Sequence, residues 1–122
     1  MSFKFSLEKS LRLLNKNDFQ NLRTGSRFFI SDVLLFYTKE NNKTFDRLGV
    51  AVTKKYGNAV KRNKIKRILR ENFRVNKEFF DSNDILISLN LRKIKKEKIS
   101  HTEVCKRIPQ SFFKAYSNKF KR

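Results

Sequence analysis

Apolar and polar residues alternate in the first half of the chain in the manner of half-buried β-strands. The stretch from Phe28 to Tyr37 is rich in β-branched and aromatic residues and predicts a strand. Successive side chains of a strand point to opposite faces, so Leu34 and Phe36 share one face. The other face carries Val33, Leu35 and Tyr37. A polar turn, Glu40 to Lys43, follows.

Two further strands are predicted on either side of a long helix. Arg47 to Thr53 is apolar at most positions and forms the second or third strand of a sheet. Asp84 to Leu91 is apolar on both faces, which indicates a strand buried on both sides. Between them the apolar residues follow a helical period from about Ala59 to Lys77, and Asn58 is the expected N-cap.

Helices are also predicted near both ends of the chain. Asn15 to Arg23 predicts a short helix that ends at Gly25. Ser100 to Glu103 has the form of a capping box and opens a C-terminal helix, in which Pro109 is expected to cause a kink. The basic stretch Arg92 to Lys98 before it is predicted to be a connector. Apolar residues recur at every fourth position of the last helix, at Val104, Ile108, Phe112 and Tyr116.

The predicted order of elements is helix, strands, helix, strand, helix. This order is typical of an α+β sandwich in which helices pack against one sheet. With 122 residues the chain has the size of one ordinary domain. We expect residues 1–122 to form that single domain, with the segments at about 1–10 and 118–122 poorly ordered.

The charge of the chain narrows the classes of partner. Thirty Lys and Arg residues stand against eleven Asp and Glu residues, which gives a formal net charge of +19. A small compact domain loses stability through self-repulsion at such a charge, so a polyanionic partner is expected. Nucleic acid is the first candidate, because neutralising phosphates releases condensed counterions, and an anionic membrane surface is the second.

Three features of the sequence indicate the cytoplasm. No apolar run approaches the length of a membrane-spanning helix. The first residues lack the apolar segment of a signal peptide. The single cysteine, Cys105, cannot form a disulfide within the chain, which fits a reducing compartment. We therefore expect a cytoplasmic protein without a membrane partner.

The most informative stretch is residues 54–70, which contains eight basic residues and no acidic one. On a helical wheel at about 100° per residue, its apolar residues fall in one arc that must face the core. This arc consists of Ile65, Ile68, Leu69 and Phe73. The opposite arc consists of Asn63, Lys66, Arg67, Arg70 and Arg74. Lys61 and Arg62 lie over the apolar side in the first turn, where they are expected to overhang the end of the sheet.

Two interpretations of the basic arc are open at this point. Most charge runs are solvated helix faces, and a solvated face normally alternates charges that pair at positions i and i+4. Here every charge is positive until Glu71, so the helix carries a repulsive cost without internal compensation. A phosphate-binding face explains that cost, since Arg binds phosphate with two hydrogen bonds and Asn63 can bond to sugar or phosphate.

The stretch from Lys54 to Glu71 carries a specific resemblance. It reads KKYGNAVKRNKIKRILRE and resembles the signature helix of the bacterial ribonuclease P protein, often called its RNR motif. Weaker similarities to this family extend over the rest of the chain. They are Arg12-Leu13 with Asp18-Phe19, Gly25-x-Arg27, Leu48-Gly49-Val50 with Thr53, and Asp84-Ile85-Leu86-Ile87.

The resemblance implies the fold of the family. That fold is an αβββαβα two-layer sandwich, in which helices pack on a four-stranded sheet. It also implies an uncommon left-handed β-α-β crossover of the ribosomal protein S5 domain 2 type. Handedness statistics alone predict the opposite, because right-handed crossovers dominate.

The resemblance further implies an accessory subunit of an endoribonuclease. In the family, an RNA subunit that requires Mg2+ removes the 5′ leader from precursor tRNA and leaves a 5′ phosphate on the mature tRNA. The protein binds this catalytic RNA and the single-stranded leader. No cofactor bound by the protein itself and no small-molecule substrate are implied.

The site residues implied by the resemblance carry over by position. The signature loop, residues 54–58, and the signature helix that follows it are expected to contact RNA through Lys54, Lys55, Lys61, Arg62, Asn63, Lys66, Arg67 and Arg70. Phe19 and Tyr37 match the aromatic positions that line the leader cleft, with core packing as the alternative role for both. The family often has a second aromatic residue in the cleft, about four positions after the one matched by Phe19. This chain has Arg23 at that position, and Leu22 is the candidate to take the place of the aromatic side chain. Further basic contacts are expected at Arg12 and Arg27.

No combination of residues indicates that the protein itself is a catalyst. Cleavage by a protein needs a paired general acid and base or a carboxylate cluster that holds metals, but the acidic residues are scattered. The only histidine, His101, has no evident partner and is expected to be a solvated surface residue. Cys105 is expected to pack in the last helix. A ribosomal or other structural RNA-binding protein is the alternative function, ahead of a stand-alone nuclease and a membrane-surface protein.

Overall fold

The structure is a computed structural model that describes residues 22, 26–41, 47–75 and 83–115. The predictions for Arg12 and Phe19 concern residues outside these ranges. The same holds for the ends predicted to be poorly ordered, for most of the helix predicted from Asn15 to Arg23, and for Tyr116 in the predicted repeat of the last helix.

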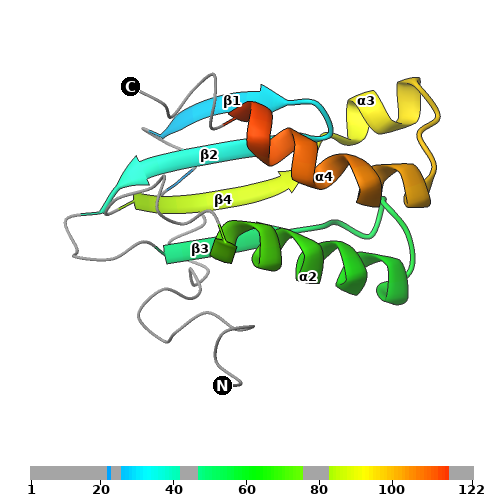
Figure 1. The fold of residues 1–122 in the computed structure, drawn as a ribbon, viewed down its shortest axis with the longest axis horizontal. Coiled ribbons are helices and arrows are strands. Elements are labelled where there is room, and N and C mark those ends of the chain that lie inside the picture. Colours follow the sequence, from blue (N-terminus) through cyan, green and yellow to red (C-terminus); the bar gives the residue numbers. More distant parts are fainter. Residues whose placement is uncertain (1–21, 23–25, 42–46, 76–82, 116–122) are drawn as a thin grey trace.

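Four strands form one mixed sheet in the order β1-β2-β4-β3 (Figure 1). They are β1 (Arg27–Ser31), β2 (Leu34–Glu40), β3 (Arg47–Ala51) and β4 (Asn83–Leu89). β2 is antiparallel to β1 and to β4, while β3 and β4 are parallel. β4 lies between two strands, and its neighbouring residues Leu86 and Ile87 are both buried although they face opposite sides. This confirms the prediction of a strand buried on both faces.

The prediction of one strand from Phe28 to Tyr37 is wrong, because this stretch folds into the β1–β2 hairpin. The turn is Asp32-Val33, and Asp32 has a φ of 51°, a left-handed conformation that Asp tolerates better than most residues. The turn interrupts the alternation of faces. Val33 is therefore fully buried in the core instead of lying on the face of Leu35 and Tyr37.

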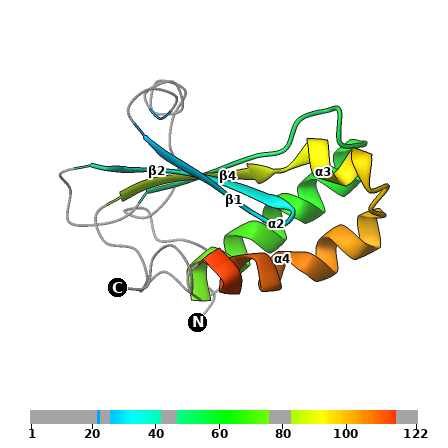
Figure 2. The same ribbon diagram turned by 90° about the horizontal axis from the view of Figure 1, so that it is seen from above.

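Three described helices follow the hairpin, α2 (Ala59–Val75), α3 (Leu91–Lys96) and α4 (His101–Ala115). Figure 2 shows α2 and α4 side by side on one face of the sheet, which confirms the predicted α+β sandwich. α2 connects the parallel strands β3 and β4, and the left-handed sense of this crossover stays a prediction. None of the described helices is long and apolar enough to cross a lipid bilayer.

The connector predicted for Arg92 to Lys98 is largely helical, so that prediction is wrong. Asn90 caps α3, because its side-chain oxygen accepts a hydrogen bond from the Lys93 N–H at 3.3 Å. The carboxylate of Asp32 in the hairpin turn lies 3.5 Å from Lys93 Nζ and 3.6 Å from Arg107 Nη1. These ion pairs tie the turn to α3 and α4.

The main core lies between the sheet and the helices. Phe36 of β2 is fully buried, stacks on Phe29 with ring centroids 5.0 Å apart, and meets the edge of Phe112 of α4 at 5.6 Å. Cys105 is partly buried against this core, as predicted. The helices contribute Ile65, Leu69 and Phe73 from α2 and Val104 and Ile108 from α4. The apolar arcs predicted for both helices are confirmed, with Ile68 at the partly buried margin.

Both predicted N-caps are present. Asn58 Oδ1 accepts a hydrogen bond from the Lys61 N–H at 3.0 Å, so α2 begins where the sequence indicated. Ser100 Oγ accepts a hydrogen bond from the Glu103 N–H at 3.1 Å and caps α4 in the same way. Pro109 lies inside α4 at an exposed position, and the kink expected there stays a prediction.

Replacing Phe36 by Ala should destabilise the fold by about 3–5 kcal/mol, because the ring is enclosed between two layers and its removal leaves a cavity. Urea denaturation followed by circular dichroism measures this loss in the free energy of unfolding. Phe113→Ala is the control, because this ring is 72% exposed on α4, and the change should stay within about 0.5 kcal/mol. Equal losses in the two variants would contradict this placement of the core.

Candidate nucleic-acid interface

The face of the sheet opposite α2 and α4 carries a continuous set of side chains. Strand register and alternation place them in two rows that cross all four strands. One row consists of Phe28, Tyr37 and Leu86 and ends on β3 at Gly49, which has no side chain, and the next consists of Ile30, Leu35, Ser88 and Ala51. This face therefore forms a second surface, separate from the main core.

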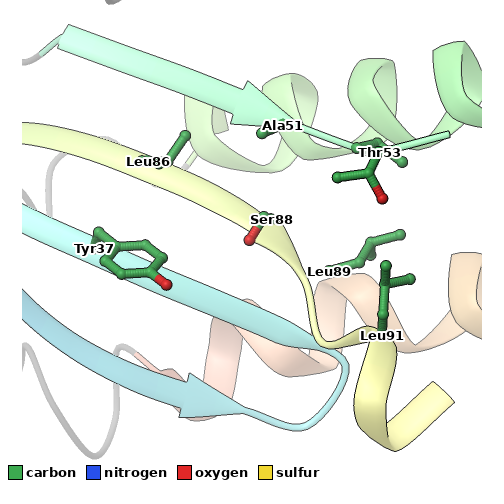
Figure 3. A pocket seen from close by; sticks show the side chains of 8 residues that line it. Tyr37, Ala51, Thr53, Leu86, Ser88, Leu89 and Leu91 are labelled. Carbon is green, nitrogen blue, oxygen red and sulfur yellow. The ribbon is translucent and has the colours of Figure 1, made fainter. Parts of the chain in front are cut away.

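A hollow of about 470 Å³ lies on this face of the sheet (Figure 3). It extends from β2 across β4 to the chain that follows β3. The described residues that line it are Tyr37, Ala51, Val52, Thr53, Leu86, Ser88, Leu89 and Leu91. Most of these side chains are apolar, and the polar ones carry hydroxyl groups and no charge. Such a lining suits a flat, uncharged group better than an ion.

Tyr37 is the predicted cleft residue that the structure places in this hollow. Its ring is half-buried and lies against Phe28, with ring centroids 4.8 Å apart. Leu22, the candidate for the second aromatic slot, is only 1% exposed and packs on Leu86 beside Tyr37 and Ala51. Leu22 therefore lies on this face of the sheet against Leu86 and presents almost no surface of its own.

One end of this face carries a carboxylate that is already paired. Asp84 of β4 accepts hydrogen bonds from Arg47 Nε at 2.8 Å and Arg47 Nη2 at 2.7 Å, and a third from Asn41 at 2.9 Å. Such a bidentate pair balances the negative charge of Asp84. Sequence reasoning missed the pair because Arg47 and Asp84 lie 37 positions apart and meet only through the register of β3 and β4.

The signature loop begins at the rim of the hollow. Thr53 lines the hollow and directly precedes Lys54 in the chain. The loop turns back through a hydrogen bond from the Tyr56 N–H to the Thr53 carbonyl at 3.0 Å. Gly57 allows a close approach, because a Cβ at this position would lie 3.3 Å from Lys61 Cδ. The hollow and the basic loop are therefore one continuous surface.

The basic arc of α2 points away from the sheet, as predicted. Lys66 and Arg62 are half-buried, and Arg62 Nε donates a hydrogen bond to the Gly57 carbonyl at 3.0 Å, which fixes the loop to the helix. The other predicted contacts of the loop and helix are exposed, and they are Lys54, Lys55, Lys61, Asn63, Arg67 and Arg70. Arg27 is also exposed, but it lies on β1, at the sheet edge opposite β3, so the structure does not group it with α2.

The charged groups of this surface suit phosphate and do not suit a metal ion. Guanidinium and ammonium groups donate hydrogen bonds to phosphate oxygens and cannot coordinate cations. In the described ranges no group of three or more His, Cys, Asp or Glu side chains is placed to hold a metal. These described residues therefore do not fit a Mg2+ site.

His101 has two partners, so the prediction of a solvated surface residue is wrong. Its Nδ1 lies 2.5 Å from the Tyr56 hydroxyl, and its Nε2 lies 3.8 Å from Cys105 Sγ. Burial raises the pKa of Tyr56 to about 12, so its hydroxyl stays protonated and forms a hydrogen bond with Nδ1 of His101. Desolvation, followed by the positive charges of Lys61 and Lys64, lowers the pKa of His101. His101 is thereby held as a neutral imidazole beside the signature loop.

Comparison with known proteins tests the resemblance of the signature helix. The profile of the family Ribonuclease P matches residues 7–121. The chain belongs to the ribonuclease P protein family. A ribonuclease P protein component from Syntrophus aciditrophicus is 40% identical over 107 residues, which cover 86% of this chain and 87% of the relative. Another from Staphylococcus haemolyticus is 41% identical over 81 residues, covering 66% of this chain and 71% of the relative.

Solved structures of the family share the fold. The RNase P protein of Staphylococcus aureus superposes with a TM-score of 0.71 at 29% identity, covering 93% of this chain and 100% of that chain. The RNase P protein of Thermotoga maritima, solved in complex with 1-(4-fluorophenyl)-2-thiourea, gives a TM-score of 0.69 at 25% identity, covering 88% and 98%. The resemblance and the fold class are confirmed. Family membership supports a role in tRNA processing and RNA binding, with an RNA subunit as partner.

Mild acid should destabilise this protein through His101. Its folded-state pKa lies below the ordinary value of 6.5, so the unfolded chain takes up the proton more readily. The contribution of neutral His101 is therefore complete above about pH 6.5 and is lost as the pH falls toward the folded-state pKa. Thermal unfolding measured between about pH 7.5 and 5.5 should show a falling Tm.

His101→Gln should flatten the dependence of Tm on pH between about pH 7.5 and 5.5, because Gln does not titrate and can still form a hydrogen bond with Tyr56. Carboxylates titrate mainly below this window, so they contribute little to the slope there. An identical slope in the variant and the unaltered protein would contradict a neutral, partly desolvated imidazole.

Proposed function

We propose that this chain is the cytoplasmic accessory protein of ribonuclease P and binds two RNA partners with two adjoining surfaces. The exposed basic residues of the signature loop and α2 bind the catalytic RNA subunit. The hollow on the other face of the sheet binds the single-stranded 5′ leader of precursor tRNA. The RNA subunit, which requires Mg2+, cuts the phosphodiester bond and leaves a 5′ phosphate.

The observation that carries this proposal is the continuity between the hollow and the signature loop at Thr53 and Lys54. Single strands bind where positive charge follows the backbone and aromatic rings meet the bases. Lys54 and Lys55 supply the charge, and Tyr37 supplies the ring. An RNA strand held at the loop can therefore continue onto the sheet without leaving the protein surface.

The protein acts through binding and electrostatics in this proposal. Two RNA molecules repel each other, and a protein of net charge +19 placed between them offsets part of this repulsion. Arg67 and Arg70 suit phosphate because one guanidinium can donate two hydrogen bonds to it. The protein thereby raises the affinity for precursor tRNA and lowers the Mg2+ concentration that the RNA requires.

His101 has no role as a general base in this proposal. Its Nδ1 is engaged by Tyr56 and its Nε2 faces Cys105 on its own helix, so neither nitrogen is directed at a bound strand. Its contact with Tyr56 instead holds the signature loop against α4. His101 is therefore a positioning residue for the loop.

Reconstitution tests the proposed function directly. The protein, a bacterial ribonuclease P RNA and a labelled precursor tRNA are combined at low Mg2+ concentration, with each component alone beside the mixture. We expect accurate leader removal only when the protein and the catalytic RNA are both present. Cleavage by the protein alone would assign the chemistry to this chain. A lack of stimulation at every Mg2+ concentration would favour a structural RNA-binding protein instead.

Arg67→Ala and Tyr37→Ala should weaken different binding steps. Arg67→Ala removes an exposed charge from α2, so it should weaken assembly with the catalytic RNA. The slope of log affinity against log salt should become shallower by about 0.7–0.9 for each phosphate that is no longer neutralised. Tyr37→Ala should spare assembly and weaken precursor tRNA binding by about 5- to 100-fold, since it removes a stacking surface.

Salt titrations of assembly and of precursor binding measure the two effects separately. Arg67 is a better choice than Arg62, because Arg62 also bonds to the Gly57 carbonyl and its replacement would disturb the loop. If Arg67→Ala and Tyr37→Ala impaired the same step to the same degree, the proposed division between the two surfaces would be wrong.

A further inference from the structure

We propose that Phe28 is a further leader-positioning residue, which forms an aromatic pair with Tyr37 and stacks the leader one position further from the cleavage site. This inference rests on the proposed leader-binding function of the hollow. It extends the path of the leader beyond Tyr37 to the edge strand β1. On this strand the resemblance implies a basic contact at Arg27 but no residue that stacks on a base.

The geometry places the two rings in one line across the sheet. Phe28 and Tyr37 are direct cross-strand partners, with ring centroids 4.8 Å apart and planes inclined by 39°. Tyr37 pairs in turn with Leu86, and Leu86 pairs with Gly49 on β3. Neighbouring strands lie about 4.8 Å apart, so Phe28 adds a second ring one strand further along the same row.

The core does not account for the position of Phe28. Its ring lies on the face opposite α2 and α4 and is 50% exposed, whereas the next residue, Phe29, stacks on Phe36 in the core. An exposed ring on an edge strand leaves apolar surface in water and promotes association, so proteins usually avoid it. A stacked base would cover this ring, and stacking does not depend on which base is present.

The surrounding charge favours RNA over a second protein as the occupant. Lys39 follows Tyr37 on the same face of β2 and is exposed. The nearby carboxylate of Asp84 is balanced by Arg47. A second copy of this chain would bring another net charge of +19 to the same edge and would be repelled. A polyanionic strand would be attracted there.

The order of the strands determines which part of the leader each ring meets. The resemblance also implies that the signature helix lies near the cleavage site. This helix and its loop follow β3, and the sheet order is β1-β2-β4-β3. A leader that starts at this loop therefore reaches Tyr37 on β2 before it reaches Phe28 on β1. Phe28 should matter only for leaders long enough to cross the sheet.

The test uses reconstituted holoenzyme and precursor tRNAs whose leaders are lengthened by one nucleotide at a time. With the unaltered protein, affinity should rise with leader length until both rings are occupied. Phe28→Ala should end this rise at least one nucleotide earlier and lower the affinity for the longest leaders by about fivefold or more. Tyr37→Ala should already lose affinity with shorter leaders.

Three variants separate stacking from other effects. Ile30→Ala is the matched control, because Ile30 lies on the same strand and face and is 55% exposed but has no ring. It should bind every leader as the unaltered protein does. Phe28→Tyr keeps a ring and should keep the affinity, whereas Phe28→Leu keeps only apolar cover and should lose it. Assembly with the catalytic RNA checks that each variant is folded.

The outcomes distinguish this inference from the proposed function. The role of Phe28 is supported if the affinity for precursor tRNA stops rising at a shorter leader in Phe28→Ala and Phe28→Leu, while Phe28→Tyr binds every leader as the unaltered protein does. Full affinity in Phe28→Ala or Phe28→Leu, beside a loss in Tyr37→Ala, would overturn the role of Phe28 alone. An affinity that does not depend on leader length in the unaltered protein would overturn leader binding itself.

Discussion

Both long helices pack on the same face of the sheet, and the two candidate surfaces depend on that packing. An amphipathic helix has one apolar arc, so burying this arc turns the opposite one outward. In α2 the buried arc is Ile65, Leu69 and Phe73, and the outward arc is basic. Because α2 and α4 share one face, the hollow beside Tyr37 can form on the other. The core contacts therefore determine where both surfaces lie.

Two of the described acidic residues, Asp32 and Asp84, connect elements of the fold, and neither lies in the first turns of α2. Asp32 joins the hairpin turn to Lys93 and Arg107, and Asp84 joins β4 to Arg47 of β3. Partly exposed ion pairs contribute little to stability, roughly 0–1 kcal/mol each. Their placement matters more for the electrostatic field, because each pair cancels a positive charge at a structural site. Exposed positive charge remains on the signature loop and helix, as well as at positions such as Lys39 of β2, and a polyanion can approach it there.

Regular periods in the sequence predicted much of the fold, and contacts between distant residues account for what was missed. The arcs of α2 and the buried strand β4 follow from local patterns. The Asp32-Val33 turn lacks the Asn-Gly or Asp-Gly signal of a tight hairpin, so one strand was expected where there are two. α3 has six residues, too few to show a helical period. The partnership of Tyr56 with His101 spans 45 positions, and the exposure of Phe28 depends on which sheet face the helices cover. Neither is encoded by a local pattern, whereas the signature residues were recognisable because their motif is contiguous.

The two proposed surfaces differ in the physics of recognition, and this difference decides what each can distinguish. Phosphate contacts along α2 are sensitive to salt and indifferent to sequence, so they bind any RNA of suitable shape. Stacking on the sheet requires unpaired bases, which a precursor tRNA offers in its leader and a mature tRNA no longer has at its 5′ end. In the proposed function, the protein's discrimination between substrate and product therefore comes from the sheet face, while the strength of assembly comes from α2. Cleavage would remove the leader that holds the substrate on the rings, so the surface proposed to favour binding of the precursor would also favour release of the product.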